Sequence, residues 1–232
     1  MKISMKNRKI GYVYGSVSGH FSFRKEKSIA FESTLERDLL YLLEFNDSVI
    51  DVEEQPFTIE YTNHNGKLVT YTPDFLVHFQ SLNSKSSTSP YPKSMIIEVK
   101  PNNILKKKFT QLRPKFKVAT QYAQECDYIF KIYDESRIRG QDLENIMFLR
   151  RYKLMTYKMD EEKKILSHLN SVGHTTIDHL LAFLYITEKQ RAIALGQIYN
   201  LLSHKKIVCD IGLKINLHTS IWLNDKYIEG DL

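Results

Sequence analysis

The stretch YTPDFLV at residues 71–77, followed by MIIEVK at residues 95–100, decides how the fold of this chain is interpreted. Both segments have the β-branched, aliphatic and aromatic residues that are typical of buried strands. Each also carries charge, from Asp74 in the first and from Glu98 and Lys100 in the second. Buried charges are costly unless they are paired or bound to a metal. The sequence therefore predicts two strands whose charged side chains form a functional site.

The spacing of these residues predicts how they meet. Glu98 and Lys100 are two positions apart, so on a strand their side chains point to the same face. Asp74 follows Pro73, a residue tolerated where a strand begins. If the two strands are neighbours, Asp74 and Glu98 can share a divalent cation with Lys100 beside it. This is the PD…E-x-K arrangement, a pattern that is common and only weakly specific by itself.

The chemistry that suits such a site is cleavage of a phosphodiester, which requires an attacking water and neutralisation of charge on the phosphoryl group. Mg²⁺ prefers oxygen ligands, and one or two carboxylates are sufficient to hold it. Asp74 and Glu98 are the predicted ligands, and the carbonyl of Val99 is a candidate third. Lys100 is expected to orient or activate water, or to stabilise the developing charge. Glu36, on a predicted helix, is expected to reach the same cation or a second one.

Each of these residues also has a purely structural interpretation. Glu36 stands three positions after Ser33, the spacing of a helix capping box. Asp74 could bond only to the turn after the proline, and Glu98 with Lys100 could be an ion pair on an exposed face. Their joint occurrence on matching elements favours the catalytic interpretation, in which Glu36, Asp74, Glu98 and Lys100 form the site.

The composition of the 232-residue chain is that of a globular protein, with 42% hydrophobic and 26% charged residues. It has no apolar run long enough to span a membrane, and the basic start without a following apolar segment leads us to expect no signal peptide. Two isolated cysteines, Cys126 and Cys209, give no metal-binding spacing and suggest a reducing, intracellular compartment. The absence of a glycine-rich phosphate loop disfavours nucleotide hydrolysis.

The net charge is +6 and is unevenly spread, because two segments are strongly basic: an arm within residues 1–27, and residues 101–117. Basic segments on both sides of an acidic site suggest a bound polyanion. A solvated basic surface is the alternative. The predicted DNA-binding residues are those of the second segment: Lys106, Lys107, Lys108, Arg113, Lys115 and Lys117.

Periodicity and turn signals predict two domains, residues 1–154 and 155–232. The first has a helix from about Ser33 to Glu44 and a further basic helix from about Ile104 to Cys126, interrupted before Pro114. Strands are predicted at residues 49–53, 57–61, 68–71, 74–79, 95–100 and 127–133, and residues 81–94 form an exposed loop. These elements predict an α/β domain with a mixed sheet flanked by helices. The second domain has helices near residues 160–169, 175–185 and 188–203, then strands at 207–210 and 215–223, which is the order of a small winged-helix-like α+β domain.

Four segments together resemble the TnsA transposon endonucleases: FESTLERDLLYLLEF at 31–45, VEEQP at 52–56, YTPDFLV at 71–77 and IEVKP at 97–101. The resemblance covers residues 10–150 by motif and residues 155–232 by layout. It implies a restriction-endonuclease-like catalytic domain whose site residues correspond to Glu36, Asp74, Glu98 and Lys100. A glutamine also occurs at the third of these positions in the family, and the glutamate here leaves the metal site intact.

The resemblance further implies a function. TnsA-like proteins cut the 5′, non-transferred strands at transposon ends, together with the DDE transposase TnsB and the AAA+ ATPase TnsC, in the bacterial cytoplasm. The expected substrate is double-stranded DNA, and the expected cofactor is Mg²⁺, for which Mn²⁺ substitutes. The C-terminal domain is expected to contact the ATPase or DNA. A standalone restriction or repair nuclease of the same fold, and a non-catalytic DNA-binding scaffold, remain alternatives.

Overall fold

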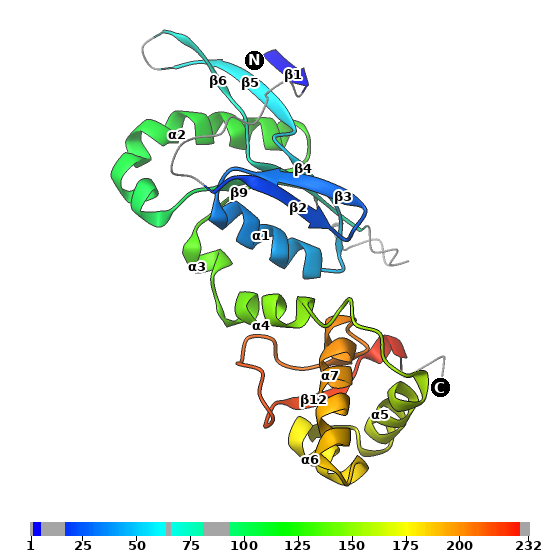
Figure 1. Cartoon of the computed structure of the whole chain (residues 1–232). Helices are drawn as coiled ribbons and strands as arrows, with labels where there is room; N and C mark the ends of the chain where they lie inside the picture. Colours follow the sequence, from blue (N-terminus) through cyan, green and yellow to red (C-terminus); the bar gives the residue numbers. More distant parts are fainter. Residues whose placement is uncertain (1, 6–16, 64–65, 81–92, 228–232) are drawn as a thin grey trace. The chain divides into compact units, whose positions relative to one another are not determined.

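A computed structural model describes residues 2–5, 17–63, 66–80 and 93–227 (Figure 1). The chain divides into two compact units, Met1–Ile138 and Arg139–Leu232. None of the helices in the described ranges is both long enough and apolar enough to cross a membrane. Parts of three predictions lie outside the described residues: the basic arm over residues 6–16, the turn at residues 64–65 and the loop over residues 81–92.

The first unit is built around a four-stranded mixed sheet of order β4-β7-β8-β9. β7 pairs antiparallel with both β4 and β8, whereas β9 runs parallel to β8. The four strands are β4 (Val49–Glu54), β7 (Phe75–Phe79), β8 (Met95–Val99) and β9 (Ile129–Tyr133). The predicted mixed sheet is therefore confirmed, and β7 and β8, the two strands expected to carry the site, are direct neighbours.

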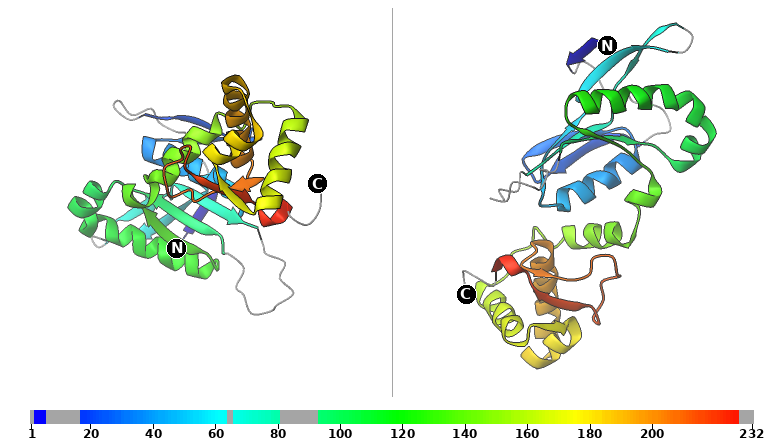
Figure 2. Two further views of the ribbon diagram at one scale, coloured as in Figure 1. Left: turned by 90° about the horizontal axis from the view of Figure 1, so that it is seen from below. Right: turned by 180° about the vertical axis from the view of Figure 1, so that it is seen from behind.

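One long helix covers each face of this sheet (Figures 1 and 2). On one face, α1 (Thr34–Phe45) buries Leu39 against Val77 and Ile97. On the other face, α2 (Asn102–Glu125) buries Ala119 in a cluster with Leu76 and Ile96. Alternating residues of β7 and β8 thus supply both cores, which explains why these strands read as nearly continuous apolar runs.

The remaining strands of the first unit form two smaller sheets. β2 (Gly19–Phe23) and β3 (Lys27–Phe31) pair antiparallel as a hairpin. β5 (Phe57–Thr62) lies between β1 (Lys2–Met5) and β6 (Leu68–Tyr71). A short helix, α3 (Glu135–Ile138), follows β9 and closes the unit.

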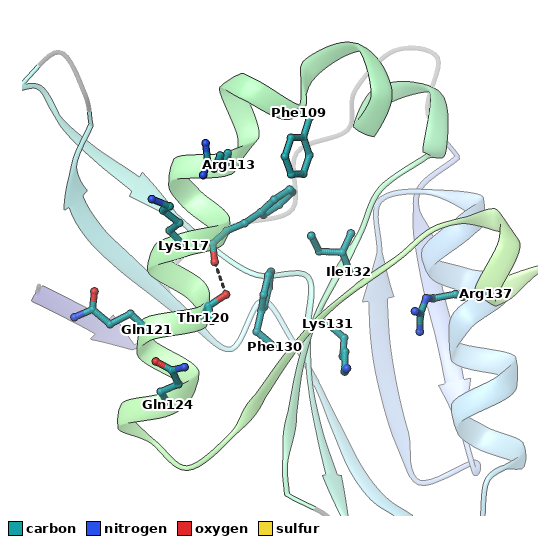
Figure 3. Close-up of a pocket in the computed structure, with 11 residues that line it drawn as sticks. Phe109, Arg113, Lys117, Thr120, Gln121, Gln124, Phe130, Lys131, Ile132 and Arg137 are labelled. Atoms are coloured by element: carbon teal, nitrogen blue, oxygen red, sulfur yellow. Dashed lines mark hydrogen bonds between the residues drawn. The ribbon is translucent and has the colours of Figure 1, made fainter.

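The basic helix is predicted to be interrupted before Pro114. This prediction is wrong, because α2 continues through this residue. A proline inside a helix removes one backbone hydrogen bond and bends the axis without necessarily ending the helix. Figure 3 shows the axis of α2 turning between Phe109 and Lys117. The helix survives because Phe116, Ala119 and Ala123 anchor its second half in the core.

The second unit packs helices around a small sheet. Its helices are α4 (Gln141–Arg150), α5 (Met159–Val172), α6 (Ile177–Leu184), α7 (Glu188–Ser203) and the 3₁₀ turn η1 (Asp225–Tyr227). The antiparallel sheet has the order β10-β12-β11, formed by β10 (His174–Thr176), β12 (Ser220–Leu223) and β11 (Ile207–Val208). The strand predicted from Ile215 begins only at Ser220, because Asn216 and Thr219 form a turn in which the Thr219 amide donates to the Asn216 carbonyl at 3.1 Å.

The division between the units falls at residues 138 and 139, earlier than the predicted 154 and 155. The difference is α4, which belongs to the second unit. The Asn145 side-chain amide donates to the carbonyls of Ile211 at 2.8 Å and Leu213 at 2.7 Å. Leu149 lies in the core of the second unit. These contacts connect residues more than sixty positions apart, so the sequence pattern of α4 alone did not reveal them.

Candidate active site

The two predicted carboxylates meet where β7 begins and β8 ends. Phe75 pairs with Ile97, so Asp74, one position earlier, lies beside Glu98, one position later. The amide of Val99 donates to Asp74 Oδ2 at 2.7 Å, which fixes the carboxylate against β8. The Asp74 side chain keeps 19% of its surface exposed, whereas Glu98 keeps only 1%. Asp74 is therefore the member of the pair that a substrate can reach.

The Glu98 carboxylate is buried, and the side chains that contact it are two lysine ammonium groups and one tyrosine hydroxyl. Its Oε1 atom accepts from Lys115 Nζ at 2.7 Å and lies 3.0 Å from Lys100 Nζ. Its Oε2 atom accepts from the hydroxyl of Tyr71 at 2.8 Å. Glu98 and Lys100 are thus not an ion pair on an exposed face, because the carboxylate lies inside the protein and is held there by three side chains.

Lys100 connects the two carboxylates. Its Nζ atom lies 3.5 Å from Asp74 Oδ2 and donates to the carbonyl of Val99 at 3.0 Å. Burial lowers the pKa of this ammonium, but the charges of Asp74 and Glu98 outweigh burial and raise the pKa above its usual range. Lys100 therefore remains positively charged at neutral pH and suits charge stabilisation better than removal of a proton.

Asp74 has the most perturbed acidity of the site. Burial is the main cause, followed by the nearby charge of Glu98, and together they raise its pKa to about 7. Lys100 and the Val99 amide act in the opposite direction without cancelling this shift. Within the described part of the chain, no donor reaches Asp74 Oδ1. The carboxylate is therefore short of positive charge, which is a property expected of a cation ligand.

Only half of the capping box predicted from the spacing of Ser33 and Glu36 is present, because Ser33 caps the Glu36 amide but the Glu36 carboxylate does not accept from the Ser33 amide. The Glu36 amide donates to Ser33 Oγ at 3.2 Å, and its carboxylate accepts from the Glu32 amide and from Ser33 Oγ, both at 2.8 Å. Burial raises its pKa, whereas these hydrogen bonds and the charge of Lys100 lower it. Glu36 also contributes to the raised pKa of Asp74. Glu36 therefore holds the Glu32 amide and the Ser33 hydroxyl at the start of α1, and it acts electrostatically on the carboxylate site at the same time.

Asp74 and Glu98 are the carboxylates of this site that could hold a metal ion. Among the described residues there is no group of three Asp, Glu, His or Cys side chains that could hold a metal. Asp74 and Glu98 provide two carboxylates, which is sufficient for Mg²⁺ because it retains several waters. The Val99 carbonyl, beside Asp74, offers a further oxygen.

The predicted DNA-binding cations of α2 separate into two groups. Lys106, Lys107, Lys108, Arg113 and Lys117 are exposed. Lys115 differs from this prediction, because its ammonium is directed to Glu98 and lies 5.1 Å from the centre of the Tyr71 ring. The burial of Ala119 and Ala123 at four-residue spacing from Lys115 is the sequence signal that marks this side of the helix.

Sequence reasoning missed Tyr71 and found no role for Gln55. Tyr71 is 27 residues from its partner Glu98, and no local pattern connects them. Burial and the Glu98 charge raise the pKa of the Tyr71 phenol well above its usual range, so it remains a donor. Gln55 has a left-handed backbone with φ of 45°, and its amide donates to the Asp74 carbonyl at 2.9 Å. Its Oε1 atom is buried without a partner in the described structure.

Comparison with known proteins gives a family match over part of the chain. Residues 46–135 match the family described as TnsA-like endonuclease N terminal. The matched segment is less than half of the chain, and it includes Asp74, Glu98 and Lys100 but not Glu36. Among curated proteins, none matches the chain. The predicted resemblance to this family is confirmed over this segment.

Proposed function

We propose that this protein is a metal-dependent DNA endonuclease that nicks the 5′, non-transferred strands at transposon ends within a cut-and-paste transposition complex. The observation that carries the proposal is the adjacency of Asp74 and Glu98, joined by Lys100, in a TnsA-like endonuclease domain. The raised pKa of Asp74 supports it, because this carboxylate lacks enough positive charge in the protein alone.

In this proposal Asp74, Glu98 and the Val99 carbonyl hold Mg²⁺, and Mn²⁺ can replace it. When bound, the ion neutralises phosphoryl charge and lowers the pKa of a coordinated water. Lys100, which remains protonated, stabilises negative charge on the phosphate or orients the attacking water. Glu36 adds negative potential on the α1 side and is a candidate ligand for a second ion.

The immediate neighbours of Glu98 act as positioning residues. Lys115 and Tyr71 fix its carboxylate from two sides, so its orientation is set before any ligand arrives. Such preorganisation avoids the cost of arranging the site during the reaction. The exposed cations of α2, namely Lys106, Lys107, Lys108, Arg113 and Lys117, bind the phosphates of double-stranded DNA in this proposal.

We also propose that residues 155–232 form a winged-helix-like domain that contacts the ATPase TnsC or DNA, while TnsB cuts and joins the 3′ ends. The order of α5, α6 and α7 followed by β11 and β12 supports this assignment. The exposed hydrophobic side chains Phe183, Ile186 and Ile193 support a role in protein contacts.

Strand-specific cleavage in a reconstituted complex tests the nuclease proposal. The chain is combined with its transposase and ATPase on DNA that contains transposon ends, with each strand labelled separately. We expect Asp74→Ala and Lys100→Ala to abolish 5′-strand cleavage while 3′-strand cleavage by the partner continues. Unchanged 5′-strand cleavage by either variant would show that the active site lies elsewhere.

Two further outcomes separate the alternatives. Efficient cutting of generic duplex DNA by the chain alone would favour a standalone restriction or repair nuclease. Failure to bind Mg²⁺ or Mn²⁺ in the presence of DNA would favour a non-catalytic scaffold. Lys67→Ala is a matched control for Lys100→Ala, because it removes an exposed ammonium from the same unit without touching the carboxylates or the cations of α2.

A further inference from the structure

A second feature of α2 is a pocket that it forms with β9 and the start of α3 (Figure 3). The cavity volume is about 480 Å³, within the range of sites that hold small organic groups. The bend of α2 between Phe109 and Lys117 makes its wall concave. The pocket shares no lining residue with the carboxylate site.

Aromatic rings form the apolar part of this pocket. The rings of Phe116 and Phe130 pack with their centres 6.0 Å apart, one from α2 and one from β9. Phe109 stands beside them with 52% of its surface exposed. Figure 3 shows the Phe109 ring on the same side of α2 as Phe130. A phenylalanine that is half exposed at the wall of a concave pocket offers a free ring face for stacking.

Cations surround these rings. Arg113 and Lys117 rise from α2, Lys131 lies on β9, and Arg137 lies on α3 at 5.7 Å from the centre of the Tyr133 ring. All four side chains belong to exposed residues, and no acidic residue lines the pocket. Among the described residues, none of the four has an acidic partner. The charge of the pocket is thus uncompensated and complements an anion.

We propose that this pocket binds an unpaired nucleotide of single-stranded DNA, with the base stacked on Phe109 and the phosphates held by Arg113, Lys117 and Lys131. Proteins that bind single strands combine these two features, aromatic stacking surfaces and a positively charged groove. In a duplex the bases are paired and stacked on one another, so an exposed phenylalanine ring would gain nothing. The inference rests on the proposed function for the choice of DNA as ligand.

The position of the pocket on α2 explains how it would serve the nuclease. Lys115 reaches Glu98, whereas Arg113 and Lys117 are each two positions away, which corresponds to about 200° around a helix. Arg113 and Lys117 therefore lie on the side of the helix away from the Lys115 side chain, while the Phe116 ring, 5.4 Å from the Lys115 ammonium, stands between the pocket and the carboxylates. An unpaired strand held in the pocket is kept out of the cutting site while it remains close to it.

Fluorescence anisotropy of the full chain with EDTA present tests this inference without cleavage. The probes are one sequence as a single strand and as a blunt duplex, the former also labelled with 2-aminopurine. We expect Phe109→Ala to weaken single-strand binding about tenfold, the effect of losing one stacked base, and to leave duplex binding unchanged. Wild type is expected to quench 2-aminopurine, and Phe109→Ala is expected to lose this quenching. Lys131→Glu should also weaken single-strand binding.

The matched controls are Leu68→Ala and Lys67→Glu, which remove an exposed apolar side chain and an exposed ammonium on and beside β6. Both are expected to bind like wild type. Single-strand binding and quenching by Phe109→Ala equal to those of wild type would overturn the proposal, as would tighter binding of the blunt duplex than of the single strand. If binding behaves as expected but the reconstituted complex does not cut the 5′ strand, the proposed function fails and this inference remains.

Discussion

The two sides of α2 use the same type of residue for opposite purposes. On one side, Lys115 is mostly buried and its ammonium contacts Glu98 at 2.7 Å. On the other side, Arg113 and Lys117 are exposed and have no acidic partner among the described residues. The Lys115 ammonium neutralises a buried carboxylate of the protein itself. The charges of Arg113 and Lys117 are available to a ligand.

The comparison teaches that a basic segment does not define a binding surface by its charge alone. Six cations between residues 106 and 117 look equivalent in the sequence. The fold separates them by helical angle, and the small residues Ala119 and Ala123 decide which side approaches the sheet. The following predictions test the two sides separately.

The largest expected effect is on catalysis, at Lys100, the cation that contacts Glu98 together with Lys115. We expect Lys100→Met to slow 5′-strand cleavage by about 100- to 1000-fold, because one preorganised positive charge is lost at the phosphate. Lys67→Met, which removes an exposed lysine outside α2, is the control and should cut at nearly the wild-type rate. Single-turnover rates in the reconstituted complex measure this difference, and equal rates for the two variants would remove Lys100 from the site.

A large effect on stability is expected at Lys115 itself. Lys115→Met leaves the buried Glu98 with one fewer cation, and breaking a buried ion pair costs about 3–5 kcal/mol. Because Lys100 still lies 3.0 Å from Glu98, we expect about 3 kcal/mol. Lys117→Met should change the free energy of unfolding by less than about 0.5 kcal/mol. Urea denaturation measures both, and equal values would show that Lys115 does not balance Glu98.

A pH-dependent effect is expected at Asp74. Its pKa in the folded protein is about 7, above the value of about 3.9 in an unfolded chain. A carboxyl group whose pKa is higher in the folded protein stabilises the fold at pH values below its pKa in the unfolded chain. This stabilisation is lost as the pH rises through its pKa in the folded protein. Without divalent cations, Asp74→Asn should therefore raise the melting temperature at pH 8 and have little effect at pH 4. A stabilisation that does not depend on pH would contradict this explanation.

The smallest effect concerns the exposed side. If Lys107 contacts a DNA phosphate, Lys107→Gln should make the negative slope of the logarithm of the DNA-binding constant against the logarithm of salt concentration shallower by about one. Lys67→Gln removes an exposed lysine from the other part of the unit and should leave the slope unchanged. Duplex binding titrated with salt, in the absence of divalent cations, measures both slopes. Identical slopes for Lys107→Gln and wild type would place the DNA away from the start of α2.

Much of the catalytic unit could be predicted because its signals are local. Alternation and turn residues gave the strands, and the spacing of Ser33 and Glu36 gave the start of α1. The pairing of β7 with β8 follows from two apolar strands that each carry charge at one end. Local patterns of this kind depend only on periodicity and capping, which are properties of short segments.

The features that could not be predicted depend on contacts between distant residues. Tyr71 reaches Glu98 from a strand of another sheet, and Asn145 joins α4 to a loop near Ile211. The pocket at Phe109 depends on the bend of α2, whose existence follows from Pro114 but whose direction does not. No periodicity encodes such pairs, because each is fixed only when the elements pack.

The most direct test of the carboxylate site is Mn²⁺ binding by the full chain, measured by electron paramagnetic resonance at pH 8. Asp74→Asn and Glu98→Gln each remove one negative charge, and Lys117→Met serves as a control that leaves the carboxylates intact. We predict that wild type and Lys117→Met bind Mn²⁺, and that both carboxylate variants lose this binding. Unchanged Mn²⁺ binding by Asp74→Asn and Glu98→Gln would contradict the assignment of these residues as metal ligands.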